Sequence, residues 1–121
     1  MPTTTVSKVL QANLNRVFSE RDAARRRQAI VELYAPDAIL YEPEGEFAGT
    51  EAIVGAVTRL LSALPPGLAF VLQSVAENHD LGKLVWKGQL PDGTIVVTGT
   101  DVARVEGERI RALYVFVDGP A

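Results

Sequence analysis

Apolar residues recur every three or four positions in the first half of the chain, which is the spacing of one face of a helix. In the first run they are Val6, Leu10, Leu14 and Val17, with Phe18 beside them. A second run covers 29–34 and is predicted to end near Pro36, because proline interrupts a helix. A third run begins at Thr50, which can cap a helix, and stops at Pro65. The pattern predicts three N-terminal helices.

The second half of the chain changes to the two-residue period of strands. Four such runs are predicted, at 69–78, 81–90, 94–105 and 109–117. Turn residues at 91–93 and 106–108 indicate antiparallel hairpins. A shorter strand at 38–42 lies between the second and third helices and leaves Glu42 at a strand end. Helices followed by antiparallel strands are typical of an α+β fold, in which helices cover one face of a bent sheet.

Composition narrows the class of protein. The chain has 121 residues, 47% of them hydrophobic, which predicts one domain over 1–121 with a polar, flexible lead at 1–5. A net charge of -3 gives no basic field for nucleic acid. No cysteine is present, and no apolar run is long enough to span a membrane. We therefore expect a cytoplasmic protein with no nucleic-acid or membrane partner, and a solvated face for the arginines at 25–27.

Three segments carry a resemblance to a known family. The stretch 33–43 (LYAPDAILYEP), followed by 49–53 (GTEAI), resembles a helix, first strand and helix start of the nuclear transport factor 2-like superfamily, which includes ketosteroid isomerase and SnoaL-type polyketide cyclases. The stretch 100–105 (TDVARV), a glycine turn and 109–113 (RIRAL) resemble the isomerase strand that places a protonated aspartic acid in the oxyanion hole. The segment 79–86 (HDLGKLVW) is similar to one in bacterial members whose histidine and tryptophan face a cavity.

The resemblance implies a cystatin-like α+β roll: a cone-shaped, curved, mostly antiparallel sheet and three N-terminal helices that enclose a pocket. It also implies a homodimer formed through the open sheet face. Glu42 matches the general base of the isomerases and Asp101 matches the acid of the oxyanion hole. Two other interpretations stay open, in which Glu42 is a solvated acid in the loop of Glu44 and Glu46, and Asp101 makes only a structural hydrogen bond.

Strand alternation tests whether Asp101 faces the predicted pocket. If Asp101 faces inward, Gly99, Ala103 and Val105 do so as well, and these residues are small or apolar enough to form a pocket wall. On the preceding strand the same argument sends Trp86 inward. Both inferences favour a cavity that carries one buried carboxyl group.

The candidate ligand contacts are Trp86, His79, Tyr114 and Asn13. The isomerases carry a tyrosine on the first helix that completes the oxyanion hole, and this chain has no tyrosine there. Loss of one of two such donors costs about 10²–10³ in rate, which makes efficient steroid isomerisation doubtful. A hydroxyl from Tyr34, Tyr41 or Tyr114 is a possible replacement, with Tyr114 the preferred candidate, although each is also consistent with a core tyrosine.

The predicted function is therefore a pocket for a small apolar ligand, with proton transfer next to a carbonyl group as an isomerase, cyclase or dehydratase would perform it. The alternative is a noncatalytic ligand-binding or dimerisation module, since a fold does not determine a function. No cofactor and no metal are expected, because the single histidine and the scattered acids have no metal-ligand spacing. The acidic loop at 42–46 remains a weak candidate for a hard cation.

Overall fold

The computed structural model describes residues 5–118. Its helices are α1 (Thr5–Asn13), the π-helical turn η1 (Leu14–Phe18), α2 (Ala23–Leu33) and α3 (Thr50–Ala63). Its strands are β1 (Tyr34–Glu42), β2 (Gly45–Ala48), β3 (Ala69–Asn78), β4 (Leu81–Gln89), β5 (Ile95–Glu106) and β6 (Arg109–Val117). Of the lead predicted at 1–5, residues 1–4 lie outside the described residues and Thr5 already begins α1.

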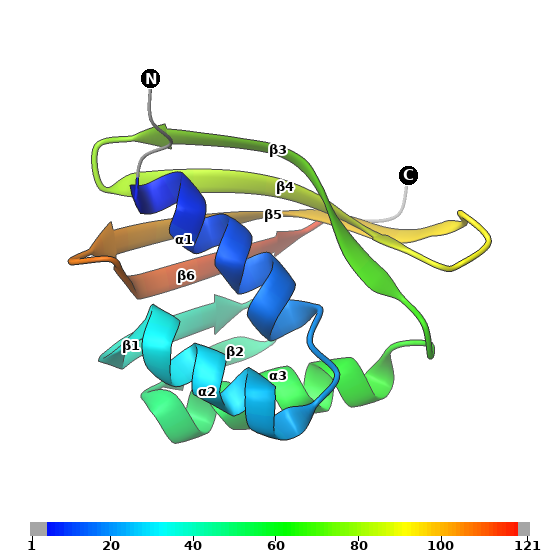
Figure 1. Cartoon of the computed structure of the whole chain (residues 1–121), viewed down its shortest axis with the longest axis horizontal. Coiled ribbons are helices and arrows are strands. Elements are labelled where there is room, and N and C mark those ends of the chain that lie inside the picture. Colours follow the sequence, from blue (N-terminus) through cyan, green and yellow to red (C-terminus); the bar gives the residue numbers. More distant parts are fainter. Residues whose placement is uncertain (1–4, 119–121) are drawn as a thin grey trace.

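The strands form one curved sheet in the order β2-β1-β6-β5-β4-β3. All neighbouring strands are antiparallel except β1 and β6, which are parallel. Figure 1 shows the three helices together on one side of the sheet, with the opposite side left open. The structure confirms the predicted α+β fold with a curved, mostly antiparallel sheet.

The boundary between α2 and β1 is earlier than predicted. The second helix ends at Leu33, and Tyr34 is already extended, with φ -110° and ψ 142°. Tyr34 pairs with Ile110 of β6, and an irregularity in the register between Tyr34 and Ile39 accommodates Pro36 within the strand. Pairing with a strand far along the sequence therefore overrides the helical period of the local residues.

Strand β2 was not predicted, because its four residues are too few and too polar to produce a two-residue hydrophobic pattern. It forms because it pairs with β1, from Ile39 opposite Ala48 to Glu42 opposite Gly45. The acidic loop of the sequence is therefore a tight hairpin. This hairpin fixes Glu42 at the end of β1, where the sheet meets α3.

Apolar helix faces pack on the inner face of the sheet. The largest fully buried side chains include Leu10, Ile30, Leu40, Ile53, Leu84, Ile110 and Leu113. Inward positions of β5 agree with the alternation argument, since Gly99, Asp101, Ala103 and Val105 are all buried. The periodicities of the sequence thus correctly identify the core faces.

One member of the arginine cluster does not lie on a solvated face. Arg26 is buried, and its guanidinium donates to the Glu20 carbonyl at 2.8 Å and to Thr58 Oγ1 at 3.2 Å. Arg25 and Arg27 are exposed, as predicted. These two hydrogen bonds satisfy the buried guanidinium and hold the start of α2 against α3.

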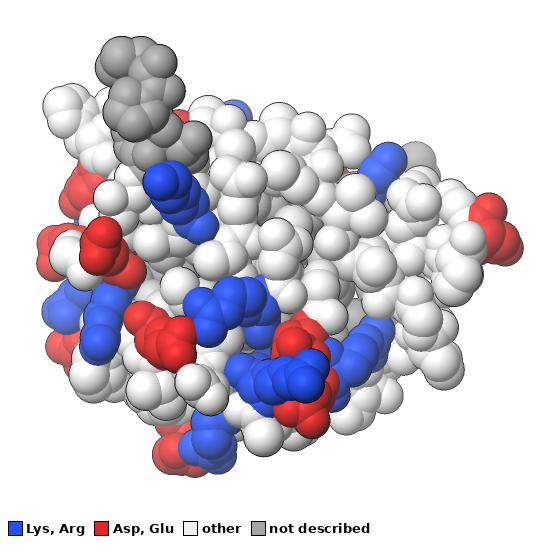
Figure 2. Space-filling view, in the orientation of Figure 1, with Lys and Arg blue, Asp and Glu red and all other residues white. Residues whose placement is uncertain are grey.

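Charges of both signs are mixed over the helices. Figure 2 shows Lys and Arg beside Asp and Glu on this face, while the region of β3 and β4 is mostly uncharged. Surface pairs such as Arg16 with Glu32, at 2.6 Å, contribute little to stability individually. Among residues 5–118, no helix has both the length and the hydrophobicity that a membrane span requires.

Candidate active site

An apolar cavity of about 200 Å³ lies between the inner face of the sheet, the end of the first helix and α3. Its apolar lining consists of Leu14, Phe18, Pro43, Leu60, Leu64, Phe70, Trp86, Val97, Val115 and Val117. Three carboxyl groups, those of Glu42, Glu44 and Asp101, complete the lining. The cavity therefore combines a hydrophobic wall with a few convergent polar groups, which is the usual composition of a small-molecule site.

One helical wall of the cavity is the π-helical turn η1, and the other is α3. The backbone amide of Ser19 donates to the Leu14 carbonyl, five residues earlier, at 3.0 Å. Such wide turns are uncommon and occur frequently at functional sites. Here the turn carries Leu14 and Phe18, which both line the cavity. Phe18 also meets Phe70 edge-on, with ring centroids 6.4 Å apart.

Asp101 is held in place by Trp86 from the neighbouring strand. The indole Nε1–H donates to Asp101 Oδ1 at 2.9 Å, and both side chains are buried. The β4–β5 register sets Leu84 opposite Asp101 and Trp86 opposite Gly99, which makes this diagonal contact possible. Because the indole occupies Oδ1, Oδ2 is free of that bond and can carry a proton toward a ligand.

Burial raises the pKa of Asp101 to about 7, against the opposing effect of the Trp86 hydrogen bond. Removing the carboxylate from water disfavours its charged form, and a single neutral donor does not compensate for this. Near neutral pH a substantial fraction of Asp101 is therefore protonated. In that form it is a hydrogen-bond donor inside an apolar cavity.

Glu42 lies at the end of β1, on the same sheet as Asp101 and separated from its strand by β6. Burial, the adjacent Glu44 carboxylate and the negative charge of Asp101 raise the pKa of Glu42 to about 7, while Arg59 opposes the shift. Its Oε1 atom is buried without a hydrogen-bond partner among the described residues. A buried acceptor without a donor is costly unless a proton or a ligand group satisfies it.

Tyr34, one of the three tyrosines that the sequence offers as a replacement donor, is buried and is influenced by the charges of both acids. The Tyr34 hydroxyl donates to Asn13 Oδ1 at 2.7 Å. Burial, followed by the negative charges of Asp101 and Glu42, holds the pKa of Tyr34 well above its usual value, with the Asn13 bond in opposition. The sequence pattern assigned Tyr34 to the second helix, so its inward position on β1 was not recognised. Recognition of Tyr34 as an inward position of the same strand as Glu42 would have revealed it.

The predicted site residues fall into two groups. Glu42, Asp101 and Trp86 line one cavity, whereas Asn13 lies behind its wall and bonds to Tyr34. His79 is exposed in the β3–β4 turn, with φ 53°, beside a separate surface hollow. A ligand in the cavity therefore does not reach His79.

Tyr114 also lies away from the cavity. It is on the outer face of the sheet, where its ring stacks on Tyr41 with centroids 4.3 Å apart and an interplanar angle of 6°. The alternation of β6 explains this position, because Leu113 is buried and Val115 and Val117 line the cavity, so the residue between them points outward. Tyr114 cannot supply the missing oxyanion hydroxyl.

The acidic hairpin does not assemble a cation site. Across residues 5–118, no three histidine, aspartate or glutamate side chains lie close enough together to hold a metal ion. Glu46 belongs instead to the surroundings of Tyr41, whose pKa it helps to raise after burial and Tyr114. The carboxyl groups of the hairpin are thus divided between the two faces of the sheet.

We expect Gly99→Ala to disrupt the support of Asp101. An added Cβ would lie 2.3 Å from Trp86 Cζ2 and 2.4 Å from the Phe116 carbonyl oxygen, so the indole would have to move. Overpacking of this kind costs about 1–3 kcal/mol of unfolding free energy, which urea titration measures. Trp86 is the only tryptophan, and its fluorescence should change with the mutation. Unaltered stability and emission would contradict the close packing of Trp86 on β5.

Comparison with known proteins agrees with this fold. The sequence profile of the SnoaL-like domain matches residues 13–113, and the chain belongs to this family. A crystal structure of a SnoaL-like family protein from Agrobacterium tumefaciens, provisionally described as an isomerase, has 27% identity and a TM-score of 0.86 over 97% of this chain and 100% of that chain. No curated protein matches the chain.

More distant structures share the fold. A protein from Jannaschia, provisionally described as a SnoaL-like polyketide cyclase, has 16% identity and a TM-score of 0.74 over 98% of this chain and 91% of that chain. A nuclear transport factor 2-like protein of unknown function from Exiguobacterium has 20% identity and a TM-score of 0.71 over 93% of this chain and 99% of that chain. These likenesses establish the nuclear transport factor 2-like fold.

Proposed function

We propose that the cavity catalyses proton transfer next to the carbonyl group of a small apolar ligand. The observation that carries the proposal is the convergence of Glu42 and Asp101, from strands far apart in the sequence, on one apolar cavity. Burial raises the pKa of each group to about 7, so that one can act as base and the other as acid at neutral pH. The relative from Agrobacterium, provisionally described as an isomerase, supports the same reaction class.

In this reaction Glu42, as a carboxylate, removes a proton from the carbon beside the carbonyl. Negative charge develops on the carbonyl oxygen, and the protonated Asp101 donates a hydrogen bond to it. Glu42 then returns the proton to a second carbon, which moves the double bond and leaves both side chains as they began. Trp86 keeps the Asp101 carboxyl directed through its bond to Oδ1.

The oxyanion site has one side-chain donor rather than two. Phe18 lines the cavity at the end of the first helix and offers no hydroxyl, while the Tyr34 hydroxyl is already bonded to Asn13. Removal of one oxyanion donor from an enzyme lowers turnover by about 10²–10³. We therefore expect modest rates, limited by the stabilisation of the oxyanion.

The volume of the cavity restricts the ligand. Cavities of about 150 Å³ hold a molecule the size of benzene. The present cavity, of about 200 Å³, therefore suits a ligand with one ring and a carbonyl group. A fused four-ring ligand would extend beyond the cavity unless α3 or the π-helical turn moved.

The proposal is tested with a cyclohexenone whose double bond lies at the β,γ position. Isomerisation to the conjugated ketone is followed by ultraviolet absorbance, and the rate should peak near pH 7, because Glu42 must be deprotonated and Asp101 protonated. Binding is monitored separately through the fluorescence of Trp86, which lines the cavity. Saturable binding without any turnover, across a set of one-ring ketones, would favour the noncatalytic binding module.

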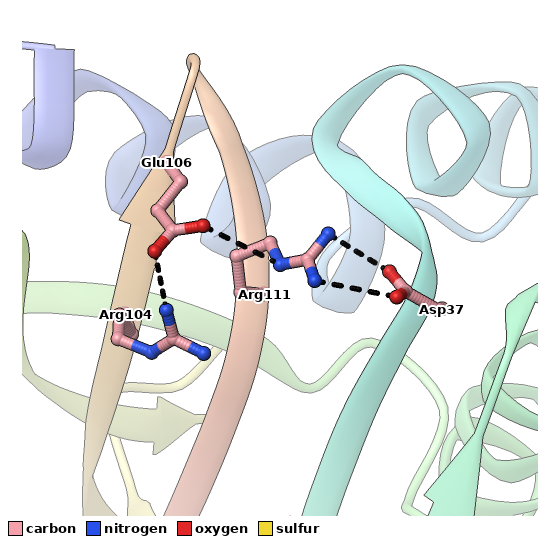
Figure 3. Close-up of polar contacts among 4 residues, drawn as sticks. All are labelled: Asp37, Arg104, Glu106 and Arg111. Carbon is pink, nitrogen blue, oxygen red and sulfur yellow. Dashed lines mark hydrogen bonds and ion pairs between the residues drawn. The ribbon is translucent and has the colours of Figure 1, made fainter.

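We also propose that the outer face of the sheet joins two copies of the chain. Tyr114 and Phe116 expose 44% and 57% of their surfaces on β6, which is unusual for aromatic residues of a monomer. Beside them, Arg111 pairs with Asp37 at 2.9 Å, and Arg104 pairs with Glu106 at 2.5 Å (Figure 3). The charges beside the two aromatic residues are therefore paired with one another, which favours coverage of this part of the face by a symmetric partner.

Phe116→Asp should separate such a dimer. Sedimentation velocity is expected to give twice the chain mass of 13.0 kDa for the native protein and the single mass for the variant. Val31→Asp is the matched control, because Val31 exposes 51% of its surface on α2, away from the sheet. A native protein that sediments at the single mass at micromolar concentration would contradict the dimer.

A further inference from the structure

We propose that Glu44 is a positioning residue of this cavity, whose carboxylate shares a proton with Glu42 and thereby sets the pH range in which Glu42 can act as a base. Its kinetic consequence rests on the proposed function, whereas the proton sharing does not. The inference rests on the geometry of the β1–β2 hairpin.

The hairpin places the two carboxyl groups together. Glu42 pairs with Gly45 at the end of the hairpin, so that Pro43 and Glu44 form the whole turn. Glu42 and Glu44 both line the cavity, Glu42 half-buried and Glu44 exposed. The proline ring fixes the backbone between them and limits how far they can separate. The pair therefore extends from the cavity interior to the solvent.

The hydrogen-bonding state of Glu42 favours a proton on this pair of carboxyl groups. Two carboxylates can only accept hydrogen bonds, and Oε1 of Glu42 is buried without a donor among the described residues. When Glu42 is protonated it becomes a donor, and the Glu44 carboxylate, two residues on in the same turn and lining the same cavity, is the neighbouring acceptor. One proton on the pair removes the repulsion that two adjacent ionised carboxylates would suffer.

Other charged and titratable groups around Glu42 do not replace Glu44. Arg59 of α3 is the cation that lowers the pKa of Glu42. Its guanidinium lies over the Phe47 ring, 5.5 Å from the centroid, and within residues 5–118 no ion pair joins it to Glu42 or Glu44. Asp101 of β5 contributes a weaker repulsion across the cavity. Tyr34 of β1 is neutral near pH 7, since its pKa is raised well above its usual value.

The test compares Glu44→Gln with Glu46→Gln. Both variants remove one charge from the same hairpin, but Glu46 pairs with Tyr41 on strand β1 and does not line the cavity. The pKa of Glu42 is read from the NMR titration of its side-chain carboxyl carbon in protein labelled at glutamate. Glu44→Gln should lower this pKa by about one pH unit, and Glu46→Gln should leave it unchanged.

Glu44→Gln removes the carboxylate but also introduces an amide donor, which could itself lower the pKa of Glu42. Glu44→Ala removes the carboxylate without adding a donor, and it should also lower the pKa of Glu42. With β,γ-cyclohexenone as the probe, the acidic limb of the rate profile should move to lower pH by the same amount. Unchanged titration of Glu42 in both Glu44 variants would overturn the proposal even if turnover is observed. A shifted titration without turnover would support proton sharing and count against the proposed reaction.

Discussion

Asp101→Asn is expected to make the protein more stable at neutral and alkaline pH. The carboxyl group of Asp101 has a pKa of about 7 when folded, against an ordinary value of 3.8. A raised acid pKa means that the folded state binds the proton more tightly, so stability falls as pH rises from the unfolded pKa to the folded pKa. The neutral amide removes this loss and still offers an oxygen to the Trp86 indole.

The gain should be small near pH 4 and on the order of 4 kcal/mol near pH 8, since the pKa rises from 3.8 to about 7 and one pKa unit corresponds to about 1.4 kcal/mol. Urea unfolding of both proteins across this range measures the difference. Asp92→Asn is the control of opposite sign, because hydrogen bonds from Thr94 lower the pKa of Asp92, so this variant should gain nothing at high pH. Equal stability of Asp101→Asn and the native protein near pH 8 would show that Asp101 is not desolvated.

Glu42→Gln is expected to lower turnover of β,γ-cyclohexenone by about 10²–10⁴, which is the usual contribution of a general base. Glutamine has nearly the same shape and no basic oxygen, so it should preserve the cavity. The affinity for a saturated cyclic ketone, measured through Trp86 fluorescence, should therefore change little. This separation of binding from turnover distinguishes loss of the base from loss of the site.

Glu46→Gln provides the control, because it removes the same charge two positions away from the cavity lining. It should retain native turnover at every pH. If Glu42→Gln keeps more than about a tenth of the native rate, Glu42 is not the base and the carboxyl assignment must be revised. Asp101→Asn, by contrast, should combine slower turnover with greater stability, as expected when a desolvated carboxyl group is kept for function at a cost in stability.

Local periodicity was enough to determine much of this protein. The spacing of Leu10, Leu14 and Val17 identified the buried face of the first helix, and strand alternation correctly sent Trp86 and Asp101 to the inner face. These predictions succeed because the side-chain direction along a helix or a strand follows from the backbone period alone. The resemblance of 33–43 and 100–113 added the family, which the SnoaL-like match confirms.

Nonlocal pairing decided the rest. Tyr34 is a strand residue because it pairs with β6, and strand β2 exists because it pairs with β1, neither of which a local pattern can reveal. The volume of the cavity depends on how α3 and the π-helical turn pack over the sheet. The pKa values of Glu42 and Asp101 follow from that packing, since burial is the largest cause of each shift. The sequence by itself therefore determined which faces are buried, and only the tertiary structure decided which buried groups meet, because their contacts join segments distant along the chain.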